Sequence, residues 1–167
     1  MKKLIMALII FKLLSGNCFA CNNLDKTSYI NLMSNKVSEM KTYYSSEKEA
    51  NELDVLTKGL KSGYFKAQIK RLEAMAYSLN NLINETKDIT VNDEVLQLKH
   101  NELIKEMGKA AKLIKDNINV KYNVSNSNLI NPINFIKGAV KDTAHTNKAN
   151  EQIEKVNELY RDIQEAN

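Results

Sequence analysis

The chain of 167 residues contains no tryptophan, one proline, five glycines and two cysteines. Both cysteines, Cys18 and Cys21, lie near the N-terminus, so a disulfide framework is excluded for the rest of the chain. Arginine is also scarce, because Arg71 and Arg161 are the only arginines among 24 basic residues, and lysine supplies the rest of the positive charge. The scarcity of proline, together with many helix-forming residues, favours an all-helical domain.

A long hydrophobic run is missing as well. The longest apolar stretch runs from Leu4 to Phe11, where Lys12 interrupts it. A membrane-spanning helix needs about 20 apolar residues, so this stretch is too short to remain as an anchor. Because it follows Lys2 and Lys3 and precedes small residues, we interpret it as a secretory signal peptide covering residues 1–20.

Two processing routes compete at the end of this signal. Signal peptidase needs small residues before its cleavage site, and a cut after Ala20 fits tolerably. Alternatively, a lipid is attached to a cysteine that becomes the new N-terminus. We favour lipidation at Cys21, with Cys18 as the alternative, because the chain uses no cysteine after Cys21. A lipid there would hold the protein at a membrane.

The remaining residues, 21–167, are expected to form one domain with a core that needs no disulfides. The net charge of +4 becomes +1 when Lys2, Lys3 and Lys12 are removed with the signal. Such a small overall charge does not favour nucleic-acid binding. Binding to an acidic partner would have to come from local clusters of lysine.

Apolar residues recur at helical spacing along most of the chain. We therefore predict an all-α, up-and-down bundle of about five helices, four longer and one short, without a sheet. Residues 119–131, rich in Asn and Ser, are predicted to form a loop, and the polar residues 143–151 of the last helix to fray or face solvent. The helices are expected at residues 25–44, 46–60, 64–87, 90–118 and 132–163.

His100 lies within the apolar stripe of the fourth predicted helix. Two interpretations are open: a haem or metal ligand with Met33 or Met40 as partner, and a hydrogen-bonded histidine at the edge of the core, or on the surface if the stripe is slightly rotated. The second is favoured, because one histidine cannot build a zinc site and no Cys-x-x-Cys-His motif is present. His145 lies in the polar stretch and is expected to be exposed.

The carboxylates of the later helices are interleaved with lysines, which is typical of solvated ion-pair faces. No nucleophile motif, glycine-rich phosphate loop or metal-binding ladder accompanies them. We therefore expect no enzymatic activity and no cofactor. The carboxylates in question are Glu102, Glu106, Glu151, Glu154 and Glu158.

Two local lysine clusters are the candidate binding residues, although a solvated face is the ordinary interpretation of each. Lys105, Lys109 and Lys112 lie at spacings of four and three residues, with Lys115 beside them. The second cluster comprises Lys58, Lys61, Lys66, Lys70 and Arg71. Either cluster has the charge to bind a sulfated glycan or another acidic surface.

The chain resembles the plasmid-encoded helical surface lipoproteins of Borrelia-type spirochaetes. The resemblance rests on the start Cys21-Asn22-Asn23, on Phe11-Lys12-Leu13-Leu14 in the signal, and on Asn131-Pro132-Ile133-Asn134 before the last helix. The segment around Phe11 and the one around Pro132 are similar to the decorin-binding members.

This resemblance implies an outer-membrane, cell-surface protein that binds a host macromolecule in adhesion or immune evasion. The ligand would be a glycosaminoglycan of the extracellular matrix or a complement regulator such as factor H. Two alternatives remain open at this stage: a structural or secretion-system protein of the periplasm, and a haem-binding bundle.

Overall fold

The computed structural model describes residues 23–58, 60–126 and 132–166, with side chains left out of the description at 44–66, 124–136, 138 and 139. The predicted signal peptide and both candidate lipidation sites, Cys18 and Cys21, lie outside the described residues.

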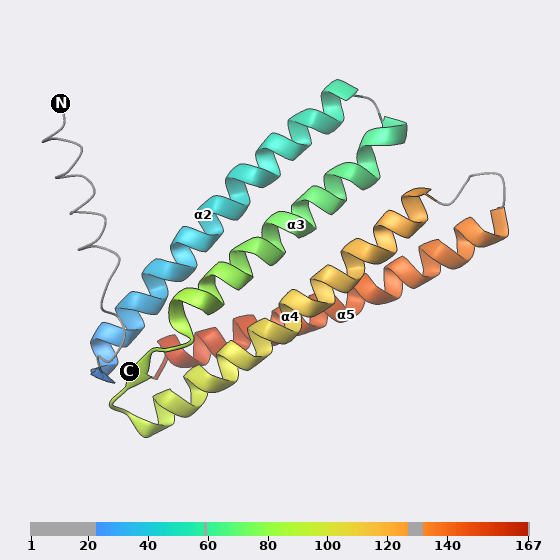
Figure 1. Ribbon diagram of the computed structural model, residues 1–167. Coiled ribbons are helices and arrows are strands. Elements are labelled where there is room, and N and C mark those ends of the chain that lie inside the picture. Colours follow the sequence, from blue (N-terminus) through green and yellow to red (C-terminus); the bar gives the residue numbers. More distant parts are fainter. Residues whose placement is uncertain (1–22, 59, 127–131, 167) are drawn as a thin grey trace, which may run out of the picture.

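Four long helices form two antiparallel hairpins (Figure 1). The first hairpin pairs α2 (Lys26–Lys58) with α3 (Leu60–Thr86), and the second pairs α4 (Glu94–Asn126) with α5 (Pro132–Gln164). The helices that pack most closely are neighbours in the chain: α2 with α3, α3 with α4, and α4 with α5. Figure 1 shows the start of α2 and the C-terminus at one end, called the base, and the ends of α2 and α4 at the other.

The two helices predicted at residues 25–44 and 46–60 form a single helix, α2. The prediction of a break at Ser45 and Ser46 was wrong, because both residues lie inside α2. Serine is a weak helix former but does not interrupt helical hydrogen bonding as proline does. The bundle therefore has four helices in the described part of the chain, and the prediction of about five is corrected.

The prediction that no sheet is present was also wrong. Strand β1 (Asn23–Leu24) pairs in parallel with β2 (Thr90–Val91), with Asn23 opposite Thr90 and Leu24 opposite Val91. Two residues are too few to produce a recognisable alternation in sequence. This pair fastens the entry to α2 onto the connection between α3 and α4.

Side-chain caps define the first turns of α2 and α4. Asp25 Oδ1 accepts a hydrogen bond of 2.9 Å from the backbone N–H of Ser28, and Asp93 Oδ1 accepts one of 2.9 Å from Leu96. Each cap satisfies a helix N–H that has no partner within the helix. Thr90, at which we predicted this helix to begin, lies instead in β2.

Helix α4 extends beyond its predicted end at Ile118. The predicted loop over residues 119–131 is helical up to Asn126, and Val120 and Lys121 are buried there. Burial of these side chains overrides the weak helix propensity of the surrounding asparagines. Residues 143–151 are likewise part of α5 and do not fray; most of them face solvent, which was the other half of the prediction, and Ala149 is buried.

The hydrophobic core draws on all four helices and lies mainly along α4. The interior near the base is apolar apart from buried Thr86 and His100, and further along α4 it also takes in Glu106, Asn117 and Lys121. Burying each large apolar side chain contributes about 1.5–3 kcal/mol. The largest apolar side chains with less than 2% exposure are Tyr29, Met33, Leu96, Leu103, Met107, Ile114 and Ile163.

Candidate functional site: the lysine face of helix α4

Lys105, Lys109 and Lys112 are all exposed and lie on one face of α4, as their spacing predicts. We call this the α4 lysine face. Gly108 lies between them in sequence, and a Cβ atom added there would meet no other atom within 4 Å. The side of the face that carries Gly108 is therefore open to an approaching ligand.

The three lysines differ in their ion pairing. Lys109 Nζ lies 2.7 Å from Glu106 Oε1, whereas Lys105 and Lys112 form no ion pair within the described residues. Glu102 and Asp116 are the other acidic residues near this face in sequence. Of these three lysines, Lys105 and Lys112 are thus the two whose charges are not paired within the described residues.

Glu106 is not the solvated carboxylate that we predicted. Its side chain is 3% exposed and contacts Lys155 Nζ at 3.3 Å and Gln152 Nε2 at 2.6 Å, both from α5. The hydrogen bond from Lys109, then that from Gln152, lower the pKa of Glu106 from 4.5 to about 2. Glu106 therefore joins α4 to α5, and it is not available to a ligand.

Lys112 and Lys115 also border an open groove between α3 and α4, with a volume of about 420 Å³. Its wall on α3 is formed by Glu73, Ala76 and Asn80. Small residues at Ala76 and Gly108 leave the groove wide. Tyr122, near the far end of α4, donates a hydrogen bond of 3.1 Å to Glu73 Oε1.

The second predicted cluster is less well defined by the structure. The side chains of Lys58, Lys61 and Lys66 lie outside the described side chains, although their backbones place them at the end of α2 and the start of α3. Lys70 is exposed on α3 and takes part in an interaction of its own. Lys70 lies one helical turn before Glu73, which lines the same groove as Lys112 and Lys115, whereas Lys61 and Lys66 lie nearer the start of α3.

A set of buried and half-buried polar side chains that sequence analysis missed lies between α4 and α5, and Gln68 of α3 joins it. We call it the inner polar seam. Lys121 Nζ contacts Asp142 Oδ2 at 2.9 Å and Gln68 Oε1 at 2.9 Å, and Asn117 Nδ2 donates to Thr146 Oγ1 at 3.1 Å. Asn117 and Lys121 are one helical turn apart and continue the buried stripe, a position that could have indicated their burial.

Three buried polar atoms of this seam have no hydrogen-bond partner among the described residues: Asn117 Oδ1, Asp142 Oδ1 and His145 Nδ1. Buried polar groups are normally satisfied by protein or by ordered water, so these three atoms are where ordered water would be expected. His145, expected to be exposed, is half-buried here. The seam is a structural feature of the helix pair rather than an accessible pocket.

His100 has no exposed surface. Its Nδ1 lies 3.1 Å from the hydroxyl of Tyr29, and the two rings meet edge to face with centroids 5.5 Å apart. Burial lowers the pKa of His100, and the nearby backbone carbonyl of Thr86 opposes this shift without forming a well-aligned hydrogen bond to Nε2. This is the hydrogen-bonded histidine that we favoured, placed in the core rather than at its edge.

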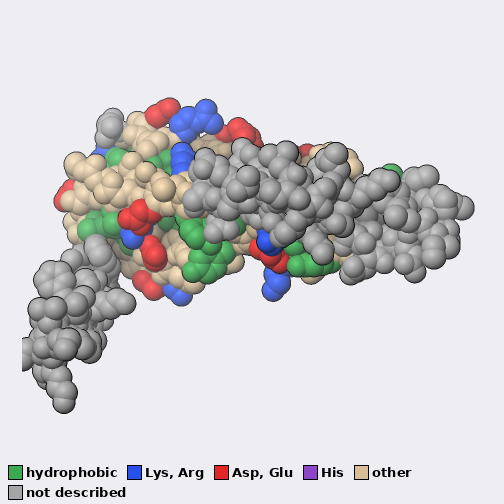
Figure 2. All heavy atoms as spheres, turned by 90° about the horizontal axis from the view of Figure 1, so that it is seen from above, with side chains coloured by type: hydrophobic (Ala, Val, Ile, Leu, Met, Phe, Trp, Pro, Cys, Tyr) green, Lys and Arg blue, Asp and Glu red, His purple; other side chains and the backbone are tan. Residues whose placement is uncertain are grey.

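Charges are mixed over the surface visible in Figure 2, where basic and acidic side chains lie beside each other with small hydrophobic patches between them. The described residues contain no group of three or more His, Cys, Asp or Glu side chains placed to hold a metal ion. None of the described helices has an apolar stretch long enough to cross a bilayer. Comparison of the chain with known protein families, with curated proteins and with solved structures finds no match.

Proposed function

We propose that the protein is an exported, lipid-anchored surface protein that binds a sulfated glycosaminoglycan through the α4 lysine face, without catalysis. The observation that carries this proposal is the exposure of Lys105 and Lys112 on one face without ion-pair partners in the described residues. Sulfate groups on a polymer attract such lysines and release counterions on binding.

The placement of the face suits a membrane-anchored binder. The predicted lipid site at Cys21 lies two residues before β1, which is at the base of the bundle. Helix α4 rises about 1.5 Å per residue from Glu94 near the base, so Lys105 to Lys112 would stand roughly 17–27 Å above it. An anchored protein would thus present these lysines away from the lipid surface.

Heparin-affinity chromatography tests the binding proposal with two matched double variants. Lys105→Gln with Lys112→Gln removes two charges from the face, and Lys141→Gln with Lys148→Gln removes two exposed charges from α5. We expect the first variant to elute at lower salt than the wild type and the second to elute with it. Equal losses in both variants would mean that net charge alone causes retention, and the proposed site would be wrong.

Localisation requires a separate test. Cys21→Ser should release the protein from membranes, or Cys18→Ser if that cysteine carries the lipid. External protease should degrade the wild-type protein on intact cells. Protection from protease would favour the periplasmic alternative, while binding of a serum protein with little salt dependence would favour a complement regulator as the ligand.

A further inference from the structure

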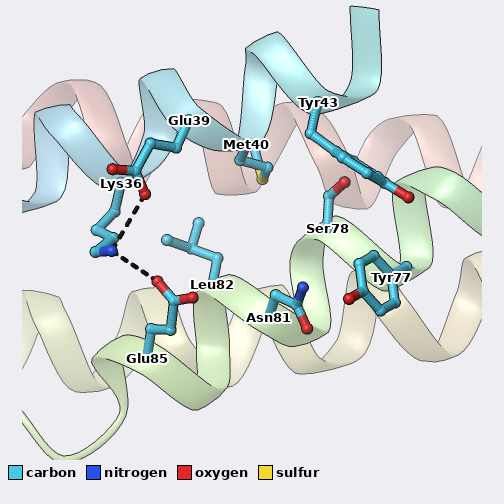
Figure 3. A pocket seen from close by; sticks show the side chains of 9 residues that line it. All are labelled: Lys36, Glu39, Met40, Tyr43, Tyr77, Ser78, Asn81, Leu82 and Glu85. Carbon is cyan, nitrogen blue, oxygen red and sulfur yellow. Dashed lines mark hydrogen bonds and ion pairs between the residues drawn. The ribbon is translucent and has the colours of Figure 1, made fainter. Parts of the chain in front are cut away.

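A second surface feature lies on the other hairpin, in a groove between α2 and α3. Its volume is about 250 Å³, and residues from Lys36 to Tyr43 on α2 and from Tyr77 to Glu85 on α3 line it (Figure 3). Buried Ser78 and Leu82, with half-buried Met40, contribute to its lining. This groove shares no residue with the α4 lysine face.

One end of the groove is anionic. Lys36 Nζ lies 2.9 Å from Glu85 Oε2 and 3.1 Å from Glu39 Oε2, so one ammonium is shared by two carboxylates. One negative charge is left over, and the side chains of Glu39 and Glu85 are 67% and 51% exposed. These carboxylates retain oxygens that can accept hydrogen bonds from a second cation.

The other end is aromatic. Tyr43 and Tyr77 have ring centroids 5.6 Å apart, with ring planes tilted by 45°. Their residues are 40% and 56% exposed, which leaves part of this pair open to solvent. Paired tyrosines offer a large apolar contact area and are common among residues that dominate protein interfaces.

The spacing of the two ends indicates the shape of the occupant. Lys36 and Tyr43 are seven residues apart on α2, which corresponds to about 10 Å along the helix. An extended chain covers this distance in three residues at about 3.3 Å each. Asn81 lies between the ends (Figure 3), where its amide can pair with the backbone of such a chain.

We propose that this groove binds an extended segment of a partner protein that carries an arginine at the carboxylates and an apolar residue three positions away at the tyrosines. Arginine fits the anionic end because its planar guanidinium can pair with two carboxylate oxygens. The apolar residue would cover Tyr43 and Tyr77. This interaction is independent of glycan binding, because α2 and α3 form the groove.

Ring-labelled tyrosine NMR of the full chain tests the proposal directly. The probe is acetyl-Arg-Gly-Gly-Leu-amide, and its matched control replaces arginine with citrulline, which has the same shape without the charge. We expect the arginine peptide to shift the ring signals of Tyr43 and Tyr77 but not those of Tyr122. Equal shifts with the citrulline peptide, or no shift at millimolar concentration, would overturn the proposal.

Two variants test separately the contribution of each end of the groove to peptide binding. Glu85→Gln should weaken peptide binding about threefold or more through the lost charge, and Tyr77→Ala about tenfold through the lost contact area. Tyr122→Phe, outside the groove, should bind like the wild type. If the wild-type signals of Tyr43 and Tyr77 broaden with protein concentration before peptide is added, a second copy occupies the groove and the proposed partner is wrong.

Discussion

Lys121 and Lys112 lie on the same helix but in different regions of the molecule. Lys121 belongs to the inner polar seam, where its side chain is 8% exposed and pairs with Asp142 of α5. Lys112 belongs to the α4 lysine face, where it is exposed and forms no ion pair within the described residues. The comparison shows that one lysine-rich helix uses some lysines to hold the bundle together and leaves others for a ligand.

The largest expected effect comes from breaking the inner seam. Lys121→Met should lower the free energy of unfolding by about 3–5 kcal/mol, because Asp142 then stays buried without its cation. Adding Asp142→Leu removes that uncompensated charge and should restore much of the loss. Urea unfolding of both variants measures this difference, and equal stability of the single and double variants would contradict the burial argument.

Glu106 is buried beneath the α4 lysine face. It pairs with Lys109 of that face and with Lys155 of α5. Its pKa is lower in the folded protein than in the unfolded chain, so the ionised form stabilises the fold above about pH 4.5. That contribution should be lost as the pH falls from 4.5 towards 2.

Glu106→Gln tests this contribution by thermal unfolding across the same pH range. The variant should be less stable than the wild type at neutral pH, and the two should converge in acid. Glu102→Gln, on the exposed side of the same helix, is the control and should unfold like the wild type at neutral pH. Persistence of the neutral-pH difference between wild type and Glu106→Gln at pH 2 would show that the ion pairs are not its cause.

A smaller effect is expected at the base, where His100 is buried beside Tyr29. Because burial lowers its pKa in the folded state, protonation favours the unfolded chain. The free energy of unfolding should therefore decrease as the pH falls below about 6.5 and level off below the folded-state pKa. His100→Asn should lose this dependence, whereas Tyr29→Phe, which keeps the imidazole, should retain it. Denaturant titrations at several pH values between 7 and 5 distinguish the two.

The sequence was a good guide where one type of residue repeats at helical spacing. The stripe through Leu96, Leu103 and Ile114 predicted α4 and its buried side, and the spacing of Lys105, Lys109 and Lys112 predicted one exposed face. These features depend on local periodicity, which a single helix imposes on its own residues.

Features that depend on a distant partner could not be predicted in the same way. The burial of Glu106 and Lys121 is set by Gln152, Asp142 and Gln68, which lie 21 to 53 residues away in the chain. The strand pair also depends on distant residues, because α2 and α3 separate β1 from β2 in the chain. Composition assigns such polar residues to the surface, since charged side chains are rarely buried without a partner.

The salt dependence of heparin binding tests the division between structural and ligand-binding lysines most directly. Affinity measured from low to physiological salt should fall linearly on a double-logarithmic plot. Replacing both Lys105 and Lys112 with Gln should make that slope shallower by about one unit per lysine, with no more than about 0.5 kcal/mol change in stability. An unchanged slope in this double variant, or an equal change in the Lys141→Gln, Lys148→Gln control, would contradict the account.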